Sequence, residues 1–219
     1  MRIIRTSTRN DALRGCDPLP VGRILGKVDT PSAFAIELPD TLIAAARSGD
    51  ERAWSEIYRR FERPVYTLAL RMTAHPDEAS EVLHDTMLKV FQGIGGFRGS
   101  APFWGWLRQI AVNTALMRLR RHERLHFSEQ PPEPEASDDV DAGWLPAAAA
   151  DAALLRQALE ALPATTRSVL WLHHGEGYTH EEIGRLMGKG PSFSKSRVSR
   201  GLQQLRERLG VTRPEVHHA

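Results

Sequence analysis

The sequence holds a single cysteine, Cys16, among its 219 residues. A framework of disulfide bonds is therefore excluded, and a reducing compartment fits this composition. Long apolar runs are also missing, since none approaches the ~20 residues that a membrane-spanning helix needs. The N-terminus carries several arginines but lacks the apolar segment of a secretory signal. We therefore expect a cytoplasmic protein with no membrane insertion.

Alternation of apolar and polar residues at period two is rare along the chain, whereas Ala, Leu, Arg and Glu are abundant. Alternation is the pattern of half-buried β-strands, and these four residue types favour helices. The predicted fold class is therefore all-α. At this length the chain can bury one large core or two small ones.

Groups that perform catalysis are not assembled in any recognisable pattern. The sequence has no nucleophile beside a base, no glycine-rich phosphate loop and no cluster of metal ligands. His122 and His126 lie four residues apart, but a structural zinc site requires four ligands and no further ligand accompanies them. The sequence therefore predicts no enzymatic activity, no cofactor and no metal site.

Charged residues, by contrast, are plentiful and unevenly placed. The formal net charge is only +2. Yet residues 185–213 hold eight Lys or Arg against one acid, Glu207, and residues 128–141 hold six acids and no base. This separation predicts a polyanion-binding end and a solvated acidic tether.

Changes of pattern divide the chain into five parts. Residues 1–38, interrupted by prolines and glycines, are expected to form a disordered extension. Residues 39–126 show helical periodicity, whereas residues 127–150 are rich in proline and acids and predict a flexible linker. Residues 151–210 form a second periodic segment, followed by a tail at 211–219. The expected architecture is two small helical domains, a helical bundle and a helix-turn-helix, joined by an acidic linker.

In the first domain, helices are expected to begin near Asp40, Asp50, Pro76 and Pro102. Aspartate is a favourable N-cap and proline suits the first turn of a helix. Pro64 falls within an apolar stripe and predicts a kink or break there. The last helix is expected to run to about residue 124 and to bury the face that carries Phe103, Trp106, Leu107, Ile110 and Ala111.

One stretch of this domain interleaves aromatic rings, cations and a polar amide. Such mixtures hold single-stranded DNA, because bases stack on rings and phosphates are attracted to cations. Trp104 lies off the apolar face and is a candidate for exposure, whereas Trp106 lies on that face. The candidate single-strand residues are Phe97, Arg98, Trp104, Arg108, Asn113, Arg118, Arg120 and Arg121.

The second domain ends in a predicted helix-turn-helix. Thr179 and Glu182 have the spacing of a capping box, Gly188 closes that helix, and the final helix begins near Ser192. The second helix of this motif enters the major groove of duplex DNA. Its candidate contact residues are Ser192, Ser194, Lys195, Ser196, Arg197, Ser199 and Arg200. The first helix of the domain is expected to bury Leu154, Leu155, Ala158, Leu159 and Leu162.

Several blocks of sequence point to a known family. In the first domain they are LIAAARSGDERAWSEIYRRF, RPVYTLALRMT, HPDEASEVLHDTMLKVF and FRGSAPFWGWLRQIAVNTALMRLRR. In the second they are LPATTRSVLWLHHGEGYTHEEIGRLMG and SKSRVSRGLQQLRERL. In this order, over residues 41–124 and 151–209, they resemble a bacterial RNA polymerase sigma factor of the extracytoplasmic-function (ECF) group.

The resemblance implies that the partners are core RNA polymerase and promoter DNA. The helix with Glu78, Glu81, Asp85 and Lys89 is expected to dock on the clamp helices of the β′ subunit, and the β flap is a further expected contact. Residues 97–121 are expected to melt the promoter and capture the non-template strand of the minus-ten element. The final helix is expected to read the minus-thirty-five element. The implied function is promoter-specific transcription initiation.

The sequence departs from the family pattern at two places. The docking helix reads Glu78-Ala79-Ser80-Glu81, where the family usually has one more acid. Phosphate on Ser80 adds about −1.5 to −2 charge, so a Ser/Thr kinase is a candidate regulator beside an anti-sigma factor. The turn GKGPSFSKS also departs, so the base preference of relatives cannot be transferred to this chain.

Two alternatives stay open at this point. A stand-alone helix-turn-helix regulator that binds duplex DNA without polymerase leaves the docking and single-strand candidates unexplained. A decoy that occupies polymerase without starting transcription would bind polymerase and give no transcript. Run-off transcription with core polymerase separates all three functions.

Overall fold

The computed structural model describes residues 32–126 and 147–209. Within these ranges the chain forms α-helices and short helical turns and no β-strand, so the all-α prediction is confirmed. The predicted acidic linker lies almost wholly outside the described residues, as do most of the N-terminal extension and the C-terminal tail. No helix in the described part of the chain is both long and apolar enough to cross a membrane.

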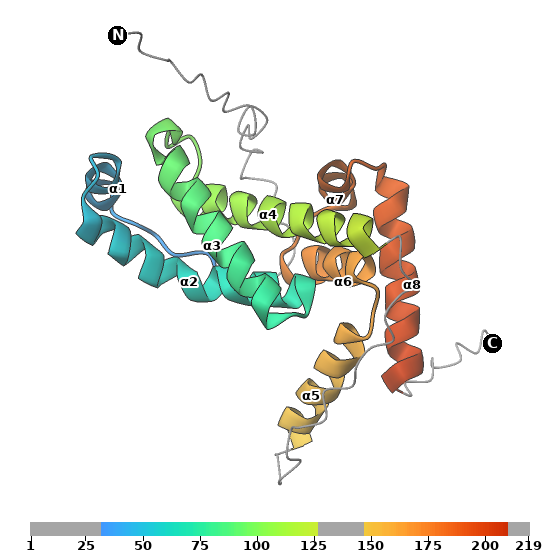
Figure 1. Cartoon of the computed structure of the whole chain (residues 1–219). Coiled ribbons are helices and arrows are strands. Elements are labelled where there is room, and N and C mark those ends of the chain that lie inside the picture. The colour runs from blue at the N-terminus through green and yellow to red at the C-terminus, as the bar shows by residue number, and fades with distance from the viewer. Residues whose placement is uncertain (1–31, 127–146, 210–219) are drawn as a thin grey trace, which may run out of the picture.

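Four helices make up the N-terminal group: α1 (Asp40–Arg47), α2 (Glu51–Thr73), α3 (Pro76–Gly93) and α4 (Phe103–His126). α2 and α3 pack side by side, and α4 packs against both of them (Figure 1). A short 3-10 turn, Ile94–Gly96, follows α3. The facing sides of the three long helices carry the apolar core, which includes Ile57, Phe61, Leu68, Val82, Val90 and Leu107.

α2 begins at its predicted cap. A side-chain oxygen of Asp50 accepts hydrogen bonds from the backbone N–H groups of Arg52 (2.7 Å) and Ala53 (3.1 Å), which have no partner within the helix. The helix then continues through Pro64 to Thr73, so the predicted break is absent. Val65, directly after the proline, is fully buried, and packing of this kind offsets the lost backbone hydrogen bond.

Residues 32–38 pack against this bundle, although the sequence placed them in a disordered extension. The side chain of Phe34 is 1% exposed and belongs to the core. A carboxylate oxygen of Glu37 accepts a hydrogen bond from the indole N–H of Trp104 at 3.3 Å. A single buried aromatic in a segment without periodicity gives no pattern, so the sequence placed the start of the domain too late.

The C-terminal group contains α5 (Ala147–Glu160), α6 (Ala164–Leu170), α7 (His180–Met187) and α8 (Pro191–Leu209). A turn of π-helix, Trp171–Gly175, extends α6. α7 and α8 form the predicted helix-turn-helix, and α6 packs against α8 (Figure 1).

The signals that set the ends of α7 are confirmed. The Thr179 hydroxyl accepts a hydrogen bond from the backbone N–H of Glu182 at 3.2 Å, and the Glu182 carboxylate accepts one from the backbone N–H of Thr179 at 2.8 Å. These two bonds are the capping box predicted from the spacing. Gly188 ends the helix in the left-handed conformation, with φ of 64°.

α5 differs from the prediction in two ways. It begins at Ala147, earlier than the predicted domain boundary at residue 151. Leu154 and Leu155, predicted to be interior, are 55% and 44% exposed, whereas Ala158 and Leu162 are buried. Because α5 packs mainly on α8, it buries only a narrow stripe of its surface.

Candidate nucleic-acid interface

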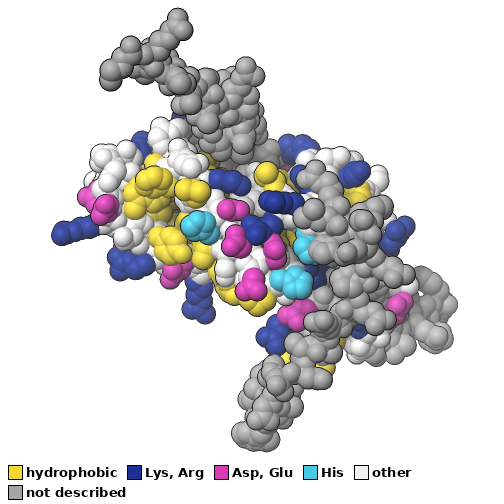
Figure 2. Space-filling model, in the orientation of Figure 1, with side chains coloured by type: hydrophobic (Ala, Val, Ile, Leu, Met, Phe, Trp, Pro, Cys, Tyr) yellow, Lys and Arg dark blue, Asp and Glu magenta, His cyan; other side chains and the backbone are white. Residues whose placement is uncertain are grey.

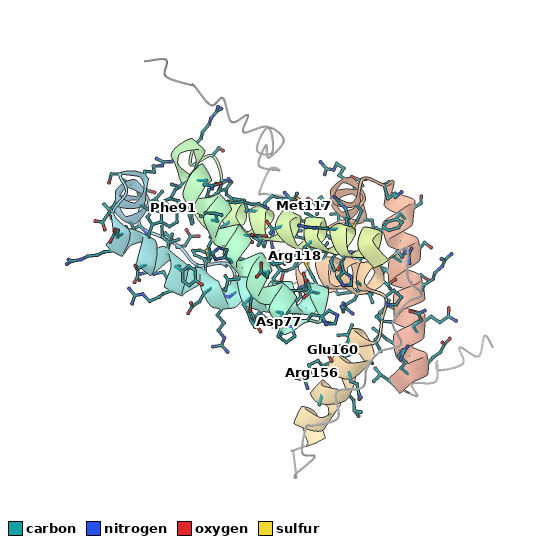
Figure 3. The ribbon with its side chains drawn as sticks, viewed as in Figure 1. Asp77, Phe91, Met117, Arg118, Arg156 and Glu160 are labelled. Atoms are coloured by element: carbon teal, nitrogen blue, oxygen red, sulfur yellow. The ribbon has the colours of Figure 1, made fainter. Side chains whose placement is uncertain are left out.

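The three predicted polymerase-docking acids surround one arginine. The Arg118 guanidinium, on α4, lies 2.5 Å from Glu78, 3.4 Å from Glu81 and 3.3 Å from Asp85, all on α3. Figure 3 places Arg118 between the two helices, and Figure 2 shows acidic side chains gathered around a basic one on this face. Burial lowers the pKa of Arg118, but pairing with these three acids outweighs that effect and raises it. We call these four residues the acidic cluster.

The cluster reassigns Arg118, which the sequence placed among single-strand contacts. Its charge is already balanced by three carboxylates, so it is poorly placed to attract a phosphate. The acids remain 32–59% exposed and keep a net charge of −2 with the arginine included. Ser80 is exposed beside them, whereas Lys89 donates a hydrogen bond to the Thr114 hydroxyl of α4 at 3.0 Å.

Next to the acidic cluster, several large apolar side chains are exposed. Phe91 and Leu88 of α3 are 54% and 46% exposed, and Tyr58 of α2 is 41% exposed. The Trp54 and Phe91 rings lie 4.8 Å apart between centroids. Figure 2 shows apolar side chains gathered beside the acidic ones.

Aromatic side chains gather where α4 begins. The Phe97 ring lies 5.3 Å from the ring centroids of both Phe103 and Trp106. Arg47 of α1 covers this cluster, with its guanidinium 5.8 Å from the Phe97 ring and a hydrogen bond from Nε to the Ile94 carbonyl at 3.3 Å. Phe97 and Trp106 are half-buried, so each offers an edge to a base.

The two tryptophans of α4 differ from the sequence interpretation. Trp104, a candidate for exposure in the single-strand surface, is 6% exposed, whereas Trp106, placed on the apolar face, is half-buried and packs against the core. Trp104 is covered by Glu37 and Arg108, and neither contact is visible in helical periodicity.

Arg108 is also buried, at 3% exposure, although it was predicted to bind single-stranded DNA. Its guanidinium lies 3.5 Å from the Glu176 carboxylate and 5.1 Å from the centre of the Tyr178 ring. Both partners belong to the C-terminal group. In this arrangement, Arg108 cannot reach a DNA strand.

The other predicted single-strand residues divide by exposure. Arg98 and Arg121 are exposed. Arg120 is exposed too, but it donates a hydrogen bond to the Leu186 carbonyl of α7. Asn113 is half-buried and accepts a hydrogen bond from Gln109 at 3.5 Å. The accessible cations of this surface therefore lie at the two ends of the predicted stretch.

α8 presents most of its predicted duplex contacts to solvent. Ser192, Lys195, Ser199 and Arg200 are exposed. Ser196 and Arg197 are half-buried, and Arg197 lies 5.4 Å over the Phe193 ring. These positions are what a recognition helix requires, since cations and hydroxyls face the groove while apolar residues face the core.

Ser194 is the exception on α8, because it is fully buried. Its hydroxyl lies 3.0 Å from Nδ1 of His180 at the start of α7, and the His180 ring stacks on His173 at 4.2 Å. Burial and the neighbouring His173 lower the pKa of His180. Ser194 therefore joins the two helices of the motif and is absent from the exposed face of α8, contrary to its predicted place among the duplex contacts.

The described residues contain no group of three or more His, Cys, Asp or Glu side chains able to hold a metal ion. His126 lies at the end of α4, where its side chain is outside the described part, as is the pair His217–His218.

Comparison with known proteins places both groups in one family. Residues 57–125 match the family model of sigma-70 region 2, and residues 152–205 match that of sigma-70 region 4. The chain is 30% identical to the ECF RNA polymerase sigma factor SigM of Mycobacterium tuberculosis over 179 residues, which cover 80% of this chain and 87% of SigM. The chain belongs to the ECF group of sigma factors.

A second relative is the ECF sigma factor SigE of Mycolicibacterium smegmatis, 30% identical over 167 residues. That match covers 74% of the chain and 65% of SigE. As a sigma factor, the protein directs RNA polymerase to promoter DNA, which is the function that the resemblance implied. Among solved structures, the sigma factor RpoE from Bartonella quintana, in complex with the anti-sigma factor NepR, has the same fold. Its TM-score is 0.52 at 24% identity, over 73% of this chain and 98% of RpoE.

The sequence missed the residues that join the two domains of this sigma factor. Arg167 of α6 is 6% exposed and donates to backbone carbonyls of α2, and Glu176 pairs with Arg108. Arg71 of α2 stacks over the Trp171 ring at 4.1 Å. An arginine within an apolar run, as in TTRSVLWL, is the only signal that could have suggested a buried role for Arg167.

Proposed function

We propose that the acidic cluster on α3 is the surface with which this sigma factor docks on the clamp helices of the β′ subunit. The carboxylates of Glu81 and Asp85 are 59% and 42% exposed, and the cluster keeps a net negative charge. Arg118 acts in this surface as a positioning residue, since it fixes three carboxylates of one helix. Basic side chains of a partner are attracted to such a face. The C-terminal domain contacts the β flap.

For the single-stranded minus-ten element, we propose a smaller surface than the sequence indicated. It contains Phe97, Arg98, Asn113 and Arg121, with the half-buried Trp106 in place of Trp104. The rings supply stacking and the arginines supply charge. Arg108 lies outside this surface, because Glu176 and Tyr178 cover it, and Trp104 lies outside it, because Glu37 and Arg108 cover its ring.

For the duplex minus-thirty-five element, we propose that α8 is the reader. The assignment rests on one observation: the second helix of the helix-turn-helix exposes four residues able to contact DNA, namely Ser192, Lys195, Ser199 and Arg200. Arg200 is the candidate for guanine, because its guanidinium can bind O6 and N7 together.

Two regulators fit this assignment. The related RpoE was solved with an anti-sigma factor, and we propose that a protein of that class also holds this chain. Ser80 is exposed within the docking helix, so a Ser/Thr kinase can reach it, and phosphate there adds negative charge to the acidic cluster. Equal polymerase affinity of Ser80→Glu and Ser80→Ala would remove the kinase from this proposal.

We propose that the sigma factor contributes no catalytic side chain and acts in the cytoplasm, where core polymerase supplies the chemistry. Run-off transcription on genomic promoter fragments tests the function, with core polymerase present in every reaction. Specific transcripts are expected only when the sigma factor is added. The Arg200→Ala variant is expected to lower them about tenfold, because one bidentate base contact contributes about 1–3 kcal/mol. Arg206→Ala, an exposed arginine farther along α8, is the matched control. Transcription that is independent of the added protein would contradict the proposal.

A further inference from the structure

Three histidines gather at the start of the helix-turn-helix. His173 and His174 belong to the π-helical turn, and His180 is the first residue of α7. The His173 ring stacks on the His180 ring, with 4.2 Å between centroids, and meets the His174 ring edge-on at 4.8 Å. His173 and His180 are half-buried, whereas His174 is exposed. We call these three residues the histidine cluster.

Hydrogen bonds hold the two stacked rings in place. Nδ1 of His173 donates to the Tyr178 carbonyl at 2.9 Å, since a carbonyl oxygen can only accept. Nδ1 of His180 shares a hydrogen bond of 3.0 Å with the hydroxyl of Ser194, which is buried on α8. A hydroxyl can donate or accept, so this second bond persists whether the His180 ring is neutral or charged. His180 can therefore gain a proton without releasing α8 from α7.

The surroundings of His180 oppose a positive charge on its ring. Burial lowers the pKa of His180 most, and His173, Lys195 of α8 and His174 lower it further. Burial and His173 also lower the pKa of His174. His174 and His180 are therefore neutral in the free protein at neutral pH.

The acids of α7 do not reverse this effect. The Glu182 carboxylate accepts hydrogen bonds from the backbone N–H and the hydroxyl of Thr179, at 2.8 Å and 2.9 Å. Glu181 is exposed in the first turn of the helix. Within the described part of the chain, neither carboxylate offsets the effect of Lys195 on His180. A partner that brings negative charge to this end of the motif favours a proton on His180.

The proposed duplex reader begins beside the histidine cluster. α7 packs against α8, whose first turns carry Ser194 and the exposed Lys195 (Figure 1). Phosphates of duplex DNA are expected at this position, because Lys195 is an accessible cation and the start of a helix attracts phosphate. A phosphate paired with Lys195 cancels the repulsion between Lys195 and a charged His180, and it attracts that charge itself.

We propose that the histidine cluster is a proton-binding site coupled to the duplex reader, so that α8 takes up a proton at His180 when it binds duplex DNA. The inference rests on the proposed role of α8. The DNA-bound state has the higher pKa, so the coupling strengthens binding at low pH and is lost as the pH rises through the pKa of the bound state. His180 acts as a positioning residue, since it reaches the reading helix through Ser194.

Fluorescence anisotropy of a short labelled duplex of mixed sequence measures the coupling with the full chain at low ionic strength. The wild type is expected to bind about fivefold more tightly at about pH 6 than at about pH 8, which corresponds to about 1 kcal/mol. His180→Asn retains a group that can hydrogen-bond to Ser194 but cannot gain a proton. Its affinity is expected to equal that of the wild type at about pH 8 and to change little at about pH 6. His84→Asn, at an exposed position of α3, is the matched control and is expected to keep the wild-type profile.

The proton itself can be counted. Calorimetry in two buffers that differ in ionisation enthalpy is expected to show proton uptake when the wild type binds the duplex at about pH 6.5, and less uptake for His180→Asn. In nuclear magnetic resonance spectra of the wild type, the His180 ring is expected to titrate at a higher pH with the duplex than without it. This last measurement needs no variant, so it decides the question even where His180→Asn does not fold.

Parallel pH profiles for the wild type and His180→Asn would overturn the inference and leave α8 as the reader. Weaker binding by the wild type at about pH 6 would also overturn it, because protonation would then disrupt the motif. An unchanged titration of His180 on adding the duplex has the same consequence. Failure of the wild type to bind the duplex at either pH contradicts the proposed role of α8 itself, and the coupling falls with it.

Discussion

Three arginines of this sigma factor have different surroundings. Arg118 pairs with three partly exposed acids, and Arg108 with the buried Glu176, through its carboxylate at 3.5 Å and its backbone carbonyl at 3.3 Å. Arg167 donates its hydrogen bonds to backbone carbonyls. Only Arg118 can be replaced by an apolar residue without leaving a buried charge or buried carbonyls unpaired. The chemistry of an arginine is therefore set by the helix that faces it, which the one-dimensional pattern does not contain.

Arg118→Met is expected to lower the free energy of unfolding by about 1 kcal/mol at low salt, because three like charges on one helix lose their shared partner. The loss is expected to shrink at high ionic strength, since these groups are partly solvated. Chemical denaturation at two salt concentrations measures both effects. Arg59→Met, which breaks one exposed pair with Glu56, is the control and is expected to cost less. An equal cost for the two variants would show that the cluster does not act as a unit.

Gly184 of α7 allows the close approach of the turn before α8. A Cβ atom there would lie 2.9 Å from the Lys189 carbonyl oxygen and 3.0 Å from the Gly190 carbonyl carbon, both backbone atoms that cannot turn away. Gly184→Ala is expected to destabilise the domain by about 1–3 kcal/mol, as overpacking does. Gly105→Ala in α4, where a Cβ meets nothing within 4 Å, is expected to stabilise by about 0.5–1 kcal/mol. Thermal unfolding that lowers both midpoints equally would refute the steric explanation.

At the scale of elements, the sequence predicted most helix starts because their signals are local. Asp50 and the pair Thr179–Glu182 bond to backbone within three residues, and Pro76 occupies the first turn of its helix, so local spacing identifies these starts. The errors arose where packing against a segment distant in the sequence determines the local structure. Pro64 stays within α2, residues 32–38 pack on the bundle, and Leu154 faces solvent. Each of these depends on which surface the rest of the chain covers.

The residues that cap the C-terminal ends of α2 and α7 both have a left-handed backbone, but one is alanine and the other glycine. Exchanging the residue type at each position therefore tests the cost of this conformation in both directions. α2 ends at Ala74 with φ of 62°, and α7 ends at Gly188 with φ of 64°. A left-handed backbone costs a residue with a Cβ about 1–2 kcal/mol, and glycine avoids that cost. Ala74→Gly is therefore expected to raise the free energy of unfolding by about 1 kcal/mol, and Gly188→Ala to lower it by about the same amount. Changes of the same sign in urea titrations would rule out backbone strain as the cause.

At the scale of the whole molecule, the sequence predicted two domains and their order, but it left them unconnected in space. Their contact depends on side chains that recognise backbone carbonyls, as Arg167 does at the end of α2, and backbone carbonyls carry no sequence signature. The packing of the domains also buries Arg108, and the distant residue Glu37 helps to cover Trp104, so neither residue could be placed correctly from the sequence. The assignment of α8 depended on a local motif and needed no such knowledge.

The packing of the two domains, in which Glu176 lies against Arg108 of α4, is here called the closed form, and it is expected to depend on pH through Glu176. Burial raises the pKa of this carboxyl group above its ordinary value of 4.5, although Arg108 opposes the shift. When the domains separate, the group returns to water and to its ordinary pKa, so the closed form binds a proton more tightly than the open form. Closure is therefore most favoured below about pH 4.5, and that advantage is lost as the pH rises through the raised pKa.

Dyes attached to cysteines at the exposed positions Arg52 of α2 and Gln204 of α8, with Cys16→Ser in the background, report the distance between the domains. Energy transfer between them is expected to fall as the pH is raised from about 4.5 towards neutrality. Circular dichroism recorded alongside must stay constant, which shows that both domains remain folded across this range. Glu176→Gln cannot titrate, so its transfer is expected to stay level over the same interval, whatever its absolute value. A wild type and a Glu176→Gln variant with parallel pH profiles would assign the dependence to other groups and remove Glu176 as its cause.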